Sequence, residues 1–396
     1  MVSEFVDFLV RYKFVILFYV AVVLFVFLRR SRFEFHFKVI ALYKTNWGLA
    51  LMERLASKYR ELIKLAGYIG IGVGFIGMVF IIFVIIQSVY TLFTVPDAPP
   101  ALMPVLPGVH IPGVPETFFI PLVQGLIAIF IVAVVHEFSH GVVARAHGIR
   151  VKKTGLALIG PFFAAFVEPD ERELKKRDDV TNYSILAAGP VSNILTFLVL
   201  FVLMSVAINP VVNAVYDNPA GISFSSITGG APADVAGLEK NVAYTIVNNQ
   251  PVLSVDDFLR LFDEIKPGED VIIANSEASY VVAAGANPSD SSKPYLGVSI
   301  YSRVEGDTTA AYAVIAWFMK LLSLVGVLSL GIGIANLLPI GLLDGGKMLQ
   351  QALHKLRGEK KGNKTLVRVS LLLLFIVLLL LTPIFRETAK AVLGAS

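Results

Sequence analysis

The chain has 396 residues, of which 56% are hydrophobic and only 16% are charged. Soluble domains carry about 25% charged residues, so this composition excludes an ordinary soluble protein and indicates a polytopic α-helical membrane protein. The chain has no cysteine, which excludes disulfides, thiolate metal sites and a catalytic thiol.

Six apolar stretches are long enough to cross the hydrocarbon core of a bilayer, which takes about 20 residues in a helix. The first stretch has no clear small-residue cleavage site, so we expect a retained span rather than a signal peptide. The six predicted transmembrane helices lie near residues 10–28, 68–93, 118–144, 183–208, 310–338 and 366–385.

A shorter apolar stretch, residues 155–167, has Gly160-Pro161 near its centre, which signals a turn. It is too short to span the bilayer, and we expect a re-entrant hairpin whose backbone is satisfied by protein or water. A short helix lying on the membrane surface is the alternative.

Lysine and arginine are unevenly distributed between the loops. Segment 29–66 carries nine of them, and segments 148–182 and 341–368 carry seven each, whereas segment 94–117 carries none. Basic loops stay in the cytoplasm, so both termini and residues 209–309 are predicted to lie outside it. The net charge of +4 therefore reflects membrane topology and gives little support to nucleic-acid binding.

Residues 209–309 are richer in charge, Asn, Ser and Gly than the rest, which indicates a small α+β extracytoplasmic domain inserted between spans four and five. Residues 230–238 and 246–252 resemble PDZ domains, although Asn248-Asn249 stands where those domains usually have Asn-Gly. Short β-like runs are expected at residues 243–247, 270–274 and 280–284, and an amphipathic helix at 255–265. We therefore divide the chain into five predicted regions. Two form the ends: the first two spans with their basic loop (1–117) and the last span (351–396). The catalytic core comprises 118–208 and 310–350, and the inserted domain between them is 209–309.

The third span contains His136-Glu137-Phe138-Ser139-His140 in otherwise apolar surroundings. Histidines four apart lie on one face of a helix and can bind one zinc ion, and the adjacent glutamate can act on a water molecule. Titratable groups at membrane depth are costly unless they are paired or bound to metal. The pattern therefore predicts a zinc site with His136 and His140 as ligands.

A catalytic zinc usually has three protein ligands, and Asp344 is the candidate for the third. It follows Pro339 and Gly341, which break the end of the fifth span near the same cytoplasmic boundary. The alternative is an exposed aspartate at an ordinary helix terminus.

These motifs resemble the site-2 protease family of intramembrane zinc metalloproteases. Asn336, Pro339, Asp344 and Gly345 match the family's Asn-x-x-Pro-x-x-x-x-Asp-Gly element. The family's Gly-Pro-x-x-Asn element is matched by Gly189, Pro190 and Asn193. Many members also carry PDZ domains inserted between these two motifs.

The resemblance implies one zinc per chain, ligated by His136, His140 and Asp344, with Glu137 as general base and then acid. Asn193 is expected either to donate to the substrate backbone or developing oxyanion, or to form an interhelical hydrogen bond.

The sequence therefore predicts an intramembrane zinc endopeptidase that cleaves within or beside a transmembrane helix of another protein, and the resemblance implies that its substrates are membrane-anchored regulatory proteins. By the resemblance, an upstream site-1-type protease has clipped these single-span substrates first. The first alternative is a metal-binding transporter, but the polar residues cluster at one depth rather than along a path. The second is a non-catalytic PDZ adaptor, which has no need to bury His136, Glu137 and His140.

Overall fold

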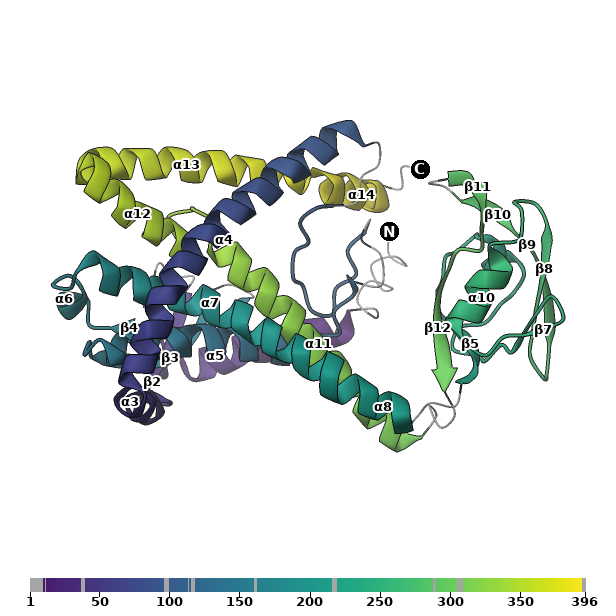
Figure 1. Cartoon of the computed structure of the whole chain (residues 1–396), viewed down its shortest axis with the longest axis horizontal. Coiled ribbons are helices and arrows are strands. Elements are labelled where there is room, and N and C mark those ends of the chain that lie inside the picture. Colours follow the sequence, from purple (N-terminus) through teal and green to yellow (C-terminus); the bar gives the residue numbers. More distant parts are fainter. Residues whose placement is uncertain are drawn as a thin grey trace. The chain divides into compact units, whose positions relative to one another are not determined.

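The computed structural model describes residues 10, 12–36, 40–95, 100–112, 114, 118–159, 162–215, 219–287, 290–304 and 309–393. The chain forms two compact units (Figure 1). One unit comprises Met1–Phe201 with Met319–Ser396, and the other comprises Val202–Phe318.

Among the described residues, five helices are long and apolar enough to cross a membrane, and each overlaps one of predicted spans two to six. The first predicted span forms an apolar helix, α2 (Lys13–Leu28), of 16 residues. At 1.5 Å per residue it is about 24 Å long, shorter than the roughly 30 Å hydrocarbon core, so six spans stays a prediction. The five long helices are Arg60–Thr94, Leu122–Ala146, Asp179–Val212, Ala310–Asn336 and Glu359–Lys390.

The helical segments before residue 216 and after residue 309 are numbered as in Figure 1. They are α2 (Lys13–Leu28), η1 (Arg30–Arg32), α3 (Leu49–Lys58), α4 (Arg60–Thr94), α5 (Leu122–Ala146), α6 (Glu171–Leu174), α7 (Asp179–Leu203), η3 (Met204–Ile208), α8 (Asn209–Val215), α11 (Ala310–Asn336), α12 (Asp344–Arg357), α13 (Glu359–Leu380) and α14 (Thr382–Leu393).

The predicted re-entrant segment forms a β-hairpin rather than a surface helix. Strands β3 (Val151–Ile159) and β4 (Phe162–Pro169) are antiparallel, and the predicted turn at Gly160-Pro161 lies outside the described residues. Strands β1 (Glu34–His36) and β2 (Ile40–Thr45), from the basic loop after α2, complete a four-stranded sheet of order β1-β2-β3-β4. β4 is therefore an edge strand of this sheet.

Helices α5, α7 and α11 pack closely around the predicted site. Ala128 and Val132 of α5 are fully buried in one apolar cluster with Leu328 of α11. A Cβ at Gly333 of α11 would lie only 2.9 Å from the carbonyl oxygen of Pro190 in α7, so this contact needs glycine. The two helices consequently bring their motif residues to a common level.

The second unit is an α+β domain, as predicted. Its core contains the fully buried Phe224 and Tyr244. Asn248 and Asn249 both have positive φ, at 48° and 65°, and form the two-residue turn between β6 (Ile246–Val247) and β7 (Gln250–Pro251). Asparagine tolerates this left-handed conformation, so the turn forms without Asn-Gly. The elements are β5 (Pro219–Ile227), α9 (Pro232–Val235), β6 (Ile246–Val247), β7 (Gln250–Pro251), α10 (Val255–Phe262), β8 (Asp270–Ala274), β9 (Ser279–Ala283), β10 (Gly285–Asn287), β11 (Asp290–Tyr295) and β12 (Val298–Val304).

The predicted strands and amphipathic helix of this domain are confirmed by β6, β8, β9 and α10. β6 and β8 pair at the centre of a four-stranded sheet of order β7-β6-β8-β9. The PDZ-like character of the domain stays a prediction.

Candidate metal centre

Two histidines of α5 face the same side of the helix, as their spacing requires. The His136 and His140 rings lie 4.9 Å apart in an edge-to-face arrangement. Their side chains are only 9% and 12% exposed. Both imidazoles are thus held within protein, where an unpaired polar group would be costly.

Asp344 is the first residue of α12, and its carboxylate is turned inward. Its Oδ2 lies 3.0 Å from Nε2 of His136 and 3.3 Å from Nε2 of His140. The other oxygen, Oδ1, lies 3.8 Å from the ammonium of Lys347. The side chain is 10% exposed, so Asp344 belongs to a buried cluster and is not an exposed terminal aspartate.

Two glycines make this position of Asp344 possible. A Cβ at Gly345 would clash with the backbone of Leu337, and a Cβ at Gly346 with the carbonyl of Ile340. The loop after α11 can therefore fold directly across the first turn of α12. The Asp-Gly-Gly sequence supplies both the carboxylate and the room for the loop that positions it.

The three side chains fit a zinc ion. Zinc bonds of 2.0–2.2 Å in tetrahedral geometry place ligand atoms roughly 3.3 Å apart, close to the observed separations of Asp344 from the two histidines. Gly189 of α7 faces both imidazoles, because a Cβ there would lie within 3.0 Å of Nε2 of both His136 and His140. The absence of a side chain at Gly189 keeps open the space onto which both nitrogens face.

Helix α7 also orients both rings. Nδ1 of His140 lies 2.6 Å from the carbonyl oxygen of Ile185, to which it donates when protonated. A neutral imidazole with its proton on Nδ1 has its lone pair on Nε2, which is the form that binds a metal. The contact with Ile185 thus favours the metal-binding tautomer.

Asn193 of α7 contacts the second imidazole. Its amide nitrogen lies 3.1 Å from Nδ1 of His136, while its Oδ1 is buried without a hydrogen-bond partner. If the Asn193 amide is rotated by 180°, its Oδ1 accepts a hydrogen bond from a protonated Nδ1 of His136. The lone pair on Nε2 of His136 is then again available to a metal. Of the two expected roles for Asn193, the structure shows the interhelical hydrogen bond; direct contact with substrate stays a prediction.

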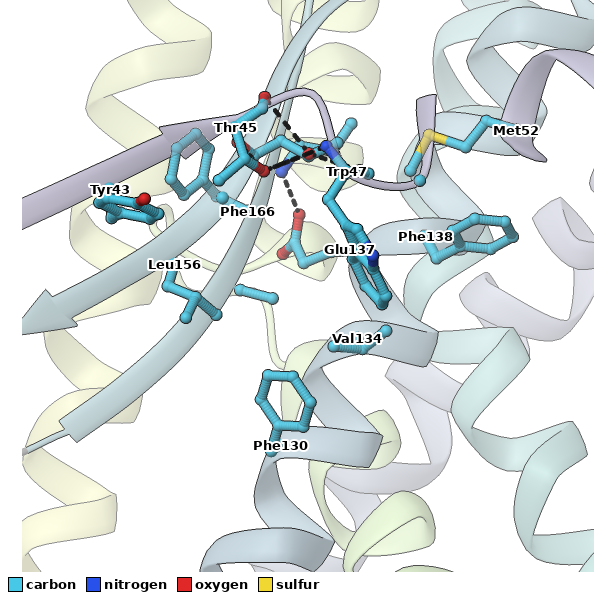
Figure 2. Close-up of a pocket in the computed structure, with 15 residues that line it drawn as sticks. Tyr43, Thr45, Trp47, Met52, Phe130, Val134, Glu137, Phe138, Leu156 and Phe166 are labelled. Carbon is cyan, nitrogen blue, oxygen red and sulfur yellow. Dashed lines mark hydrogen bonds between the residues drawn. The ribbon is translucent and has the colours of Figure 1, made fainter. Parts of the chain in front are cut away.

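Glu137 points away from the two histidines, toward the sheet. Its Oε2 accepts a hydrogen bond of 3.0 Å from the backbone N–H of Val167 in β4. The potential ligand atoms of His136, Glu137 and His140 nevertheless lie within 4.8 Å of one another. Figure 2 shows the Glu137 carboxylate at the wall of a cavity between α5 and the sheet. Glu137 is therefore placed to exchange protons with a molecule bound beside the histidines.

Several parts of the site were not predicted from the sequence. Strands β1 and β2 and Trp47 come from a loop expected only to be basic. The alternation of aromatic and polar residues from Arg32 to Lys38 is a strand signal for β1, but it ends before β2 begins. No pattern in the neighbouring sequence predicts the contacts that Gly189 and the Ile185 carbonyl make with the two histidines. Asn336, part of the matched motif, donates to the carbonyl of Ile332 within its own helix.

Comparison with known proteins agrees with this geometry. A model of peptidase family M50 matches residues 124–380, a range that contains every residue of the cluster. The chain is also 32% identical over 149 residues to "Uncharacterized protein MJ0971" of Methanocaldococcus jannaschii. That match covers 37% of this chain and 38% of the relative, so the chain aligns with well under half of the relative's length.

Replacement of Gly189 by alanine should weaken metal binding while leaving every ligand in place. The added methyl group would occupy the space that both Nε2 atoms face, and we expect at least tenfold lower metal affinity. Gly70→Ala in α4 is the matched control, because a Cβ there makes ordinary contacts of 3.8–3.9 Å. Titration of the metal-free variants with zinc measures both affinities. Equal affinities would contradict the proposal that the open space at Gly189 is needed for metal binding.

Proposed function

The chain belongs to peptidase family M50, the site-2 protease family of membrane metalloproteases, and we propose that it is a zinc endopeptidase that cleaves transmembrane segments of other proteins. One observation carries the proposal. A carboxylate from α12 meets two imidazoles from α5 inside the helical unit, and a further carboxylate, that of Glu137, stands beside them.

We assign zinc to His136, His140 and Asp344. When bound there, zinc supplies a Lewis acid that lowers the pKa of water and polarises the scissile carbonyl. Glu137 then takes a proton from the attacking water and transfers it to the amide nitrogen as the peptide bond breaks. The hydrogen bond from Val167 to Glu137 supports this role, because it fixes the carboxylate at the side of the cluster that faces the cavity.

Substitutions distinguish the proposed zinc ligands from the proposed catalytic base. Glu137→Gln should retain about one zinc per chain and lose about 10²–10⁴-fold in hydrolysis, because the amide has the same shape but cannot accept the proton. His136→Ala, His140→Ala and Asp344→Ala should lose both zinc and activity. Elemental analysis and a cleavage assay on the same preparations measure the two properties. A Glu137→Gln protein without zinc would show that Glu137 is a ligand and not the base.

Cleavage of a helix first requires local unwinding, because each carbonyl in a helix is hydrogen-bonded four residues on. Freed backbone groups are costly in apolar surroundings unless they are paired again. Edge strand β4 offers such pairing. The N–H of Val167 points away from β3 to Glu137, so by strand alternation the N–H of Ala165 also faces the open edge. We propose that the substrate adds there as an extended strand.

Proline substitutions at adjacent positions distinguish the two edges of β4. Ala165→Pro removes a donor from the open edge and should lower cleavage roughly 2- to 12-fold without loss of zinc or thermal stability. Ala164→Pro removes a donor that faces β3 and should instead destabilise the hairpin. Cleavage rates and melting temperatures of both variants test this, and a wild-type rate for Ala165→Pro would contradict strand addition.

We further propose that the substrates are single-span, membrane-anchored regulatory proteins already shortened by a site-1-type protease. The inserted domain would exclude proteins that retain a large ectodomain. In this arrangement it lies outside the cytoplasm and the zinc site lies toward the cytoplasmic face, as the charge distribution of the loops supports.

Single cysteines test this orientation cleanly because the chain has none of its own. Ser291→Cys, in exposed β11, should react with an impermeant thiol reagent in intact cells. Lys176→Cys, in an exposed loop before α7, should react only after lysis. The reverse pattern would show that the protein has the opposite orientation.

A further inference from the structure

Beside Glu137 lies a cavity of about 260 Å³ between α5 and strands β2 to β4 (Figure 2). Its walls are largely aromatic and aliphatic. An apolar cavity of about 150 Å³ already takes up benzene, so this one has room for a large side chain. Its apolar wall includes Trp47, Phe130, Val134, Phe138, Leu156 and Phe166.

The threonines in the wall are already engaged with protein. The hydroxyl of Thr154 bonds to the carbonyl of Trp47 at 2.7 Å and lies 3.2 Å from the hydroxyl of Thr45. The hydroxyl of Thr45 also accepts from the backbone N–H of Trp47. The cavity is therefore suited to an apolar group, with the Glu137 carboxylate at its wall.

We propose that this cavity binds the side chain of the substrate residue that follows the scissile bond, and that it selects a bulky apolar residue there. This inference rests on the proposed function. Glu137 delivers its proton to the departing amide nitrogen, and that nitrogen belongs to the residue following the scissile bond. The side chain of this residue is consequently the one that lies nearest the carboxylate.

The strand geometry supports the same placement. Side chains of a strand added to β4 alternate between the two faces of the sheet. Phe130, Val134 and Phe138 of α5 line the cavity together with one of these faces. The cavity lies on this face, where Ala165 and Val167 of β4 both line it.

The apolar surface continues beyond the first cavity. A second cavity of about 180 Å³ shares Phe130, Leu156 and Ala165 with the first and extends along α5 to Leu126. A substrate residue two positions further on would point to the same face of the sheet. The continuous apolar lining suits a segment taken from a membrane span, because such segments supply successive apolar side chains.

The test is a panel of single-span substrates that differ only in the residue after the cleavage site, which is identified by mass spectrometry. The wild-type protein should cleave the Leu and Phe substrates at least tenfold more efficiently than the Ala substrate. Val134→Phe, which fills the cavity, should lower the ratio of cleavage of the Leu and Phe substrates to cleavage of the Ala substrate about tenfold.

Two further variants separate selectivity from general damage. Val123→Phe makes the same change at a position of α5 that is 61% exposed, and its preference should match that of the wild type. Trp47→Ala removes an indole from the wall of the cavity and should weaken the preference for the Leu substrate over the Ala substrate. Because Trp47 is 72% exposed, little buried packing is lost with it.

The outcomes are distinguishable. A wild-type enzyme that cleaves every member of the panel equally, or a Val134→Phe enzyme with unchanged preference, would overturn the subsite and leave the protease activity standing. A wild-type protein that cleaves no member would overturn the proposed function and this inference together.

Discussion

The contact between a buried carboxylate and two buried imidazoles is the constraint on which the helical unit depends. Asp344 and His136 are 208 positions apart in the chain, yet their polar atoms lie 3.0 Å apart. Three titratable groups cannot be left unpaired at membrane depth without a cost of several kcal/mol. The helices must therefore pack so that these groups meet, and small residues are needed wherever that packing brings backbones together.

Helix α7 is the scaffold of this arrangement although none of its side chains is assigned as a ligand. Its backbone accepts from His140 at Ile185, its amide side chain meets His136 at Asn193, and it has no side chain at Gly189 where both rings face it. These contacts orient both rings, and the Ile185 carbonyl favours the tautomer of His140 that binds a metal. The Gly-Pro-x-x-Asn element is thus explained by shape and hydrogen bonding.

The parts of the site that depend on local spacing were predictable. His136 and His140 share a helical face wherever their helix lies, and the broken helix end before Asp344 marks a residue free to turn inward. What depends on pairing between distant segments was not predictable. Strand β2 joins β3 across about 110 positions, as the hydrogen bond between Thr45 and Thr154 shows, and a single sequence gives no register for such a pair. The hairpin itself was expected, but the sheet that extends it was not.

The order of the ligands along the chain also has a consequence for biosynthesis. The two histidines enter the membrane with α5, whereas Asp344 follows only after α7, the inserted domain and α11 have been made. At 5–20 residues per second, the interval between His136 and Asp344 is roughly 10–40 s. A nascent chain during that interval holds an incomplete set of donors beside Glu137. Completion of the centre is therefore coupled to synthesis of α7, the inserted domain and α11, so a chain that is still being made before Asp344 has no assembled metal centre beside Glu137.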